Sequence, residues 1–326
     1  MKVMVVLGTR PEVIKLSPVI AALRPLAQTI VCATGQHREL LSQALASFGI
    51  VPDIALDTMQ ANHSLNGLAA RLLDGLDGAI EAAAPDWVLV QGDTTTAFCG
   101  GFAAFNRGVR IGHVEAGLRT GDLASPFPEE ANRQLLSRIA THHFPPTDAA
   151  RQALLAEGIE AGRVTTTGNT VVDAIEQRRQ GWASDSAAPE GPIVLVTCHR
   201  RENLGERLAG ICAAIARLCA RYPGHRFVFP LHYNPAVREP VRQKLGAIAN
   251  LELIEPLDYD DNLRMIGRSV LVITDSGGIQ EEAPSFGVPA VVMRDHTERQ
   301  EGVAAGFAML AGCDPDAIVA AAAGWL

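Results

Sequence analysis

The sequence predicts an α/β protein with two doubly wound domains, and three observations support this prediction. Short aliphatic runs alternate with helical, alanine-rich stretches along nearly the whole chain. Continuous apolar runs of this kind are typical of parallel strands whose two faces are both covered by helices. The length of 326 residues exceeds what one core usually fills. A polar, proline-containing stretch at residues 184–192 separates two similar alternating series.

The first series predicts strands at residues 2–8, 29–34, 87–91 and 109–114 and a helix at 11–24. A helix predicted at residues 170–182 comes directly before the linker. The second series predicts strands at residues 193–197, 226–230, 251–255, 270–274 and 290–293. We therefore expect a first Rossmann-like domain at residues 1–183 and a second at residues 190–326.

Composition excludes several classes of protein. The 28 Lys and Arg residues against 36 Asp and Glu give a net charge of -8, which argues against broad binding to nucleic acid or to anionic membranes. No apolar run is long enough to insert into a membrane. The six cysteines form no CxxC pair and no zinc-like spacing with histidine, so we predict no metal site and a reducing, cytoplasmic location.

Residues 113–133, HVEAGLRTGDLASPFPEEANR, have the composition of a reaction centre. This stretch holds four carboxylates, two arginines and a histidine, and a segment that serves packing alone rarely tolerates so many ionisable groups. Glu115 is expected at the end of a strand, and Glu129 in the first turn of a helix that begins at Pro128. The alternative is structural: acidic residues complement a helix dipole, and Arg133 is four residues after Glu129 and can pair with it.

Polar motifs follow five of the predicted strands. They are Gly8-Thr9-Arg10, Gly92-Asp93-Thr94, His113 to Glu115, His199 to Asn203, and Asp275-Ser276-Gly277-Gly278. Ligands of open parallel sheets bind beyond the carboxyl ends of the strands. Because both series contribute such motifs, we predict one cleft between the two domains.

Each of these motifs also has a structural interpretation. Arg10 and Lys15 stand at a helix start that favours an anion, but they also suit a solvated helix turn. Asp93 is either an acid–base group or an N-cap. His199, next to two arginines, offers donors for a diphosphate. No G-x-G-x-x-G or P-loop motif supports a nicotinamide cofactor or a P-loop nucleotide site.

The glycine-rich motif near residue 276 suits a diphosphate. Ser276, Gly277 and Gly278 allow close backbone approach and add a hydroxyl donor, although Ser276 can equally act as an N-cap. Glu282 can accept hydrogen bonds from a ribose diol, or it can simply complement the helix dipole. Arg299 suits either the nucleotide site or the surface.

Together, these motifs resemble those of the non-hydrolysing UDP-N-acetylglucosamine 2-epimerases. The resemblance spans about residues 2–312 and is carried by GTRPEVIKLSPVI, TGQHRELL, QGDTTTAF, HVEAGLRTGDLASPFPEEANR, TGNTVVDA, CHRRENLGE and TDSGGIQEEAPSFGVPAVVMRDHTER. It implies two Rossmann-like domains facing a cleft, the GT-B type. It also implies reversible conversion of UDP-N-acetylglucosamine to UDP-N-acetylmannosamine, through elimination of UDP to a 2-acetamidoglucal and readdition. No cofactor is expected, because this reaction involves no net oxidation or reduction.

The resemblance also implies roles for individual residues. Asp93, Glu115 and Glu129 resemble the family's acid–base carboxylates, which Arg133 and His199 assist. The expected substrate contacts are Arg10, Lys15, Ser276, Gly277, Gly278, Glu282 and Arg299. Gln36 and Glu39 match a region that regulates some family members through a second substrate site. The family is typically dimeric, so we expect a homodimer.

Two further expectations concern the end of the chain and the substrate. The family usually continues past the position of Leu326 with an Asn-Pro-Tyr-Gly-Asp-Gly-like segment, so we expect a C-terminal tail shorter than the family norm. The shared motifs also allow other functions. These are 2-epimerisation of a modified UDP-sugar of the diacetamido-uronate type, a hydrolysing 2-epimerase, a GT-B glycosyltransferase, and UDP-sugar binding without turnover.

Overall fold

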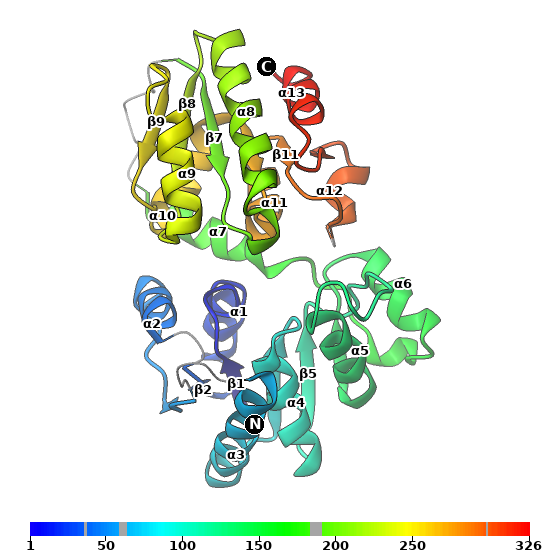
Figure 1. The fold of residues 1–326 in the computed structure, drawn as a ribbon. Helices are drawn as coiled ribbons and strands as arrows, with labels where there is room; N and C mark the ends of the chain where they lie inside the picture. Colours follow the sequence, from blue (N-terminus) through cyan, green and yellow to red (C-terminus); the bar gives the residue numbers. More distant parts are fainter. Residues whose placement is uncertain (36–37, 59–63, 183–190, 298) are drawn as a thin grey trace. The chain divides into compact units, whose positions relative to one another are not determined.

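The chain folds into two compact units, Met1–Gln177 and Arg178–Leu326. The computed structural model describes residues 1–35, 38–58, 64–182, 191–297 and 299–326. Figure 1 shows the first unit in blue to green and the second in green to red. Each unit is an α/β sandwich with its own parallel sheet, as the alternating pattern predicted.

The first unit contains a six-stranded sheet with the order β3-β2-β1-β4-β5-β6. Its strands are β1 (Lys2–Leu7), β2 (Gln28–Ala33), β3 (Ile54–Ala55), β4 (Trp87–Gln91), β5 (Arg110–Val114) and β6 (His142–Phe144). Its helices are α1 (Arg10–Leu23), α2 (Arg38–Ser47), α3 (Leu65–Ala83), α4 (Thr95–Asn106), α5 (Glu129–Ile139), α6 (Asp148–Ala156) and a 3-10 turn, η1 (Ala161–Arg163). Helix α7 (Thr170–Gln180) continues into the second unit.

Strand β1 shows how the sequence builds this sandwich. Val3 and Val5 pack in one cluster with residues of α1 and α2, whereas Met4 and Val6 pack on the other face with residues of α3 and α4. All four side chains are almost fully buried. Burial on both faces stabilises each of them by roughly 1.5–3 kcal/mol, which explains why the strand reads as a continuous apolar run.

The second unit repeats this topology. Its sheet has the order β12-β11-β10-β7-β8-β9, which corresponds strand for strand to the first sheet. The strands are β7 (Ile193–Thr197), β8 (Arg226–Pro230), β9 (Leu251–Ile254), β10 (Ser269–Thr274), β11 (Ala290–Val292) and β12 (Ala308–Leu310). The helices are η2 (Arg201–Asn203), α8 (Glu206–Arg221), α9 (Pro235–Leu245), α10 (Tyr259–Arg268), α11 (Gly277–Glu282), η3 (Ala283–Phe286), α12 (Gln300–Ala304) and α13 (Pro315–Ala323).

Every strand that the sequence predicted is present, with its ends within one residue of the prediction. Two helix starts were wrong by one position. Helix α1 begins at Arg10 rather than at residue 11. Pro128 is the N-cap of α5 rather than its first helical residue, so α5 begins at Glu129. Among the described residues, no helix is both long enough and apolar enough to cross a membrane.

Candidate active site

The polar turns of the first unit meet where the strand order reverses. Strands β1 and β4 are neighbours, and the chain leaves them toward opposite edges of the sheet, so the turns after these two strands border the usual ligand site of this fold. Gly8, directly after β1, lies in a tightly packed position. A Cβ atom there would lie 2.4 Å from the hydroxyl oxygens of Thr34 and Thr96, so only glycine fits.

A buried carboxylate links these two turns. Glu12, in the first turn of α1, is fully buried. It accepts hydrogen bonds from the backbone N–H groups of Gly8 (2.9 Å) and Thr9 (2.7 Å) and from the Thr9 hydroxyl (2.8 Å). Its other oxygen accepts from the Thr94 hydroxyl at 2.7 Å. Burial raises the pKa of Glu12, and these hydrogen bonds oppose that shift.

Glu115 and Lys15 form a buried ion pair. Glu115 follows β5 with a φ of 60°, in the left-handed region that residues other than glycine rarely adopt. The Lys15 ammonium contacts its carboxylate, and Gln91 donates a hydrogen bond to the same carboxylate at 2.9 Å. The side chains of Lys15 and Glu115 are only 8% and 7% exposed. The unusual backbone thus places a charged, hydrogen-bonded carboxylate at the end of the central strands.

Asp93 and Arg133 form a second charged contact, between the β4–α4 turn and helix α5. The Arg133 Nε atom donates to Asp93 Oδ2 at 2.7 Å, and Asn132 donates to the Asp93 backbone carbonyl at 2.8 Å. Arg133 also donates to Glu130 at 3.1 Å. Burial raises the pKa of Glu130, but hydrogen bonds from Gln134, the Thr120 backbone and Arg133 outweigh this effect and lower it overall.

His113 supports the same turn from inside the sheet. Its Nε2 atom is 2.7 Å from the Gly92 carbonyl, and its ring is completely buried. Burial lowers the pKa of His113 to about 4, although the Gly92 carbonyl acts in the opposite direction. The imidazole is therefore neutral near pH 7 and donates from Nε2 to the turn that holds Asp93.

In the second unit, the corresponding turns follow β7 and β10. These strands are neighbours at the point where the second sheet reverses its order. Asp275, directly after β10, is completely buried and lies 3.0 Å from the Nδ1 atom of His199, which belongs to the turn after β7. Burial alone raises the pKa of Asp275. Hydrogen bonds from the His199 side chain and from the backbone of Arg200 and His199 outweigh this and lower it to about 2.

The glycine-rich motif begins helix α11. The Ser276 hydroxyl accepts from the Ile279 N–H group at 3.4 Å, so it serves as the N-cap that was the structural alternative. Gly277 is buried, whereas Gly278 is exposed at the start of the helix. Glu282, the last residue of α11, is buried.

Arg299 contacts the same helix. Its Nε atom donates to Glu281 Oε1 at 2.5 Å, and the two side chains are 14% and 4% exposed. Arg299 is therefore bound to α11 rather than pointing into solvent as an isolated surface charge, and it lies beside the helix that carries the glycine-rich motif.

The remaining candidates are placed less specifically. Arg10 and Glu129 are the first residues of α1 and α5, and both are half-buried. Gln36 lies outside the described residues. The backbone of Glu39 belongs to α2, but its side chain also lies outside the described part of the chain.

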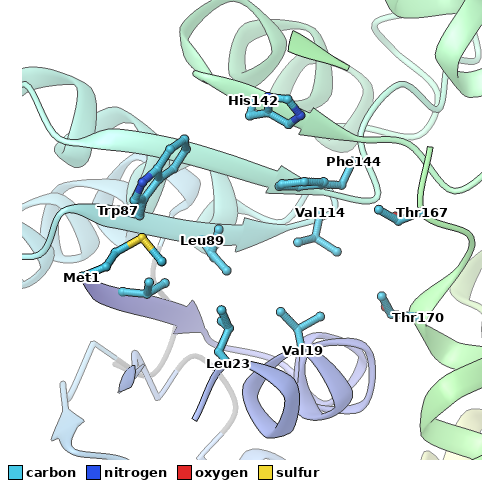
Figure 2. A pocket seen from close by; sticks show the side chains of 11 residues that line it. Met1, Val19, Leu23, Trp87, Leu89, Val114, His142, Phe144, Thr167 and Thr170 are labelled. Atoms are coloured by element: carbon cyan, nitrogen blue, oxygen red, sulfur yellow. The ribbon is translucent and has the colours of Figure 1, made fainter. Parts of the chain in front are cut away.

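An apolar pocket of about 560 Å³ lies on the first sheet, apart from these charged groups. Figure 2 shows Leu89 and Val114 of the sheet opposite Val19 and Leu23 of α1. The described lining residues include no lysine, arginine or carboxylate side chain. This lining suits apolar atoms and offers nothing to neutralise a diphosphate.

The comparisons with known proteins identify the family. Residues 22–326 match the family model described as UDP-N-acetylglucosamine 2-epimerase. The chain belongs to this family. The UDP-N-acetylglucosamine 2-epimerase of Escherichia coli K12 is 46% identical, over 98% of this chain and 89% of the relative.

Solved structures of the family superimpose on the whole chain. The Neisseria meningitidis enzyme bound to UDP-GlcNAc has a TM-score of 0.90 at 43% identity and covers 99% of this chain and 91% of its own. The Methanocaldococcus jannaschii enzyme, in complex with UDP-GlcNAc and UDP, has a TM-score of 0.87 at 32% identity and covers 100% and 93%. These matches confirm the GT-B-type pair of Rossmann-like domains that the family resemblance implied.

The structure also reveals buried acidic groups that the sequence analysis did not select as site residues. Glu12 and Asp275 each join two turns, and Glu130 binds Arg133. A signal for Glu12 was present in the sequence, because Thr9-Arg10-Pro11-Glu12 matches the capping-box pattern. Asp275 stands directly after an apolar strand, but position alone does not reveal its bond to a residue 76 positions away.

Proposed function

We propose that this protein interconverts UDP-N-acetylglucosamine and UDP-N-acetylmannosamine. In this proposal UDP is eliminated to give a 2-acetamidoglucal, and readdition of UDP is accompanied by reprotonation at C2 from the opposite face. The main support, in a chain of this family, is the pair of charged sites around Glu115 and Asp93 in the first unit. Asp93 follows β4, one of the two strands at which the sheet order reverses. Glu115 follows the neighbouring strand β5 and contacts Gln91 at the end of β4.

The chemistry requires such an arrangement. The proton on sugar C2 is weakly acidic, so its removal and return need positioned acid–base groups on both faces of the ring. We assign this work to Asp93, Glu115 and Glu129, with Arg133 and His199 assisting. Because the ammonium of Lys15 is in contact with Glu115, it stabilises the ionised carboxylate that can accept a proton.

We assign UDP binding to the second domain, residues 190–326, and the acid–base groups to the first, residues 1–183. Ser276, Gly277 and Gly278 offer backbone N–H groups to the diphosphate, and Glu282 offers a carboxylate to the ribose. Arg299, next to α11, adds positive charge for the nucleotide. Arg10 and Lys15 are the proposed sugar-nucleotide contacts of the first domain.

The test is NMR spectroscopy of the full chain with UDP-N-acetylglucosamine in deuterated water. We expect UDP-N-acetylmannosamine to appear with deuterium at C2. Product that retains protium at C2 would exclude elimination and reprotonation. Replacing Asp93 by Asn, or Glu115 or Glu129 by Gln, should each slow turnover by about 10²- to 10⁴-fold. Glu252→Gln, at an exposed ion pair with Arg226, is the matched control and should leave turnover unchanged.

The same NMR assay, combined with UDP-binding and competition measurements, separates the alternative functions. A diacetamido-uronate sugar that competes more strongly than UDP-N-acetylglucosamine would identify the modified-sugar epimerase. Binding of UDP without any exchange at C2 would identify a non-catalytic binding protein. Free UDP that accumulates together with N-acetylmannosamine would identify a hydrolysing enzyme, and UDP release that depends on an added acceptor would identify a glycosyltransferase.

We further propose that the protein is a cytoplasmic homodimer. The six free, buried cysteines are compatible with a reducing compartment. Sedimentation analysis should give a dimer mass of twice 34.6 kDa. Regulation through Gln36 and Glu39 predicts sigmoidal substrate dependence that becomes hyperbolic in the variant Gln36→Ala.

A further inference from the structure

Asp275 is the buried acidic group that holds the two central turns of the second unit together. Its side chain is completely buried, between the turn that follows β7 and the start of α11. Its neighbours on the two strands also bond to each other, because the hydroxyl groups of Thr197 and Thr274 are 2.6 Å apart. The carboxylate is therefore fixed relative to His199.

Asp275 is surrounded by hydrogen-bond donors. One carboxylate oxygen, Oδ2, accepts from the backbone N–H groups of His199 (3.0 Å) and Arg200 (2.9 Å) and from the Asn203 amide (3.0 Å). The other oxygen, Oδ1, accepts from the His199 N–H at 3.1 Å and lies 3.0 Å from His199 Nδ1. An ionised carboxylate has only acceptor sites, so the Nδ1 atom that faces it must carry a proton.

We propose that Asp275 is a positioning residue that holds His199 in the Nδ1–H tautomer. In the neutral ring, Nε2 is then the basic nitrogen, and the His199 side chain is 41% exposed. The tautomer assignment rests on the geometry alone. Its catalytic consequence, a ring oriented to accept a proton at Nε2 and to return it, rests on the proposed function.

The variant Asp275→Asn tests this role almost without a change in volume. Three donors converge on the position of Oδ2, so the amide oxygen of asparagine should occupy that position. The NH₂ group then faces Nδ1 and makes this nitrogen an acceptor. We therefore expect the variant to switch His199 to the Nε2–H tautomer, with its proton on the wrong nitrogen for the proposed role.

The first readout is the pair of imidazole ¹⁵N chemical shifts of His199, measured at alkaline pH in histidine-labelled full-length protein. The signal is assigned by its loss in His199→Gln. The wild type should show a protonated Nδ1 atom and Asp275→Asn a protonated Nε2 atom. A wild-type ring protonated at Nε2 would overturn the proposal, and this measurement requires no Asp275 variant that folds.

The second readout is a double-mutant cycle on epimerisation. Asp275→Asn should lower kcat by on the order of 100-fold while UDP affinity changes little. In the His199→Gln background the same substitution should cost less than about threefold, because Asp275 acts through His199. Losses that multiply in the double mutant would show a general structural role and overturn the proposal. Asp316→Asn, at an exposed ion pair with Arg217, is the control and should change neither readout.

The two readouts separate this proposal from the proposed function. If the wild type shows the Nδ1–H tautomer but no epimerisation, the proposed function fails while the assignment of Asp275 stands. If epimerisation occurs but Asp275→Asn leaves the tautomer unchanged, the assignment of Asp275 fails and the proposed function stands.

Discussion

Lys15 neutralises Glu115 in a position that water hardly reaches. Both side chains are less than a tenth exposed. Removing one partner of a buried pair leaves the other charge uncompensated, so we expect Lys15→Met to lower the free energy of unfolding by about 3–5 kcal/mol. Urea unfolding measures this change. Arg217→Met, which breaks an exposed pair with Asp316, should cost less than about 1 kcal/mol, and equal losses in the two variants would contradict the buried-pair argument.

His143 and His113 make stability dependent on pH. Burial is the main reason that the pKa of His113 is lowered to about 4 and that of His143 to about 3, whereas an unfolded histidine titrates near 6.5. The unfolded chain therefore binds more protons than the folded one between about pH 6.5 and pH 4. The contribution of the two neutral histidines to the free energy of unfolding is fully present above pH 6.5. Below pH 6.5 the free energy of unfolding falls by up to about 1.4 kcal/mol per pH unit for each histidine.

His143→Leu tests this dependence. Neither ring nitrogen of His143 has a hydrogen-bond partner among the described residues, so leucine removes a titrating group without breaking such a bond. Urea unfolding from pH 7.5 down to pH 5 should show a shallower loss of stability in the variant than in the wild type. Parallel pH profiles would show that His143 does not contribute to this dependence.

At the scale of single residues, the sequence indicates candidate side chains but not their partners. The sequence motifs indicate Asp93, Arg133, Glu115 and Lys15 separately, and the structure joins them as two pairs. Asp93 and Arg133 are 40 positions apart in the chain, and Lys15 and Glu115 are 100 positions apart. Local sequence patterns therefore contain no information about these contacts. The contact of Asp275 with His199 was missed for the same reason.

At the scale of elements, the start of α4 serves two purposes. The Thr94 hydroxyl accepts from the Ala97 N–H at 3.0 Å as an N-cap and donates to Glu12 at 2.7 Å. We expect Thr94→Val to destabilise the protein by about 1–2 kcal/mol and also to lower turnover, because the turn carrying Asp93 loses its link to the β1–α1 turn.

Thr147→Val is the matched control for this prediction. Thr147 caps α6 through the Ala150 N–H at 3.1 Å, in the same way that Thr94 caps α4. Thermal unfolding should show a comparable loss of stability, whereas the epimerisation assay should show unchanged turnover. If both variants lost turnover equally, the effect of Thr94 would be that of a cap and not of its bond to Glu12.

Whether a strand could be predicted from the sequence depends on its burial and its length. Central strands such as β1, β4 and β7 are buried on both faces and read as apolar runs that no loop would contain. The strands β3, β6 and β12 lie at the edges of the two sheets, have only two or three residues each, and were not predicted. Such short edge strands are specified by pairing with a neighbour, which the sequence pattern does not display.

At the scale of the whole molecule, the two units share one sheet topology and one type of buried contact between turns. In each sheet, two neighbouring central strands end in turns that are joined by a completely buried carboxylate: Glu12 in the first unit and Asp275 in the second. An acceptor-only group suits this place, because turns after parallel strands present N–H and hydroxyl donors. The repeated contact keeps the candidate site residues of each unit in a fixed position relative to its sheet.

The proposal that the second unit binds UDP predicts which part of the backbone UDP protects from hydrogen exchange. Ligand binding to the folded state stabilises it by about 2.7 kcal/mol at a concentration 100 times the dissociation constant. Hydrogen exchange with saturating UDP should therefore slow most strongly in residues 275–282, around the start of α11. Uridine, which lacks the diphosphate, should give much weaker protection there, and strand β6 beside the apolar pocket should not respond specifically to the diphosphate. Equal protection by UDP and uridine would show that the start of α11 does not hold the diphosphate, and it would move the phosphate site elsewhere in the chain.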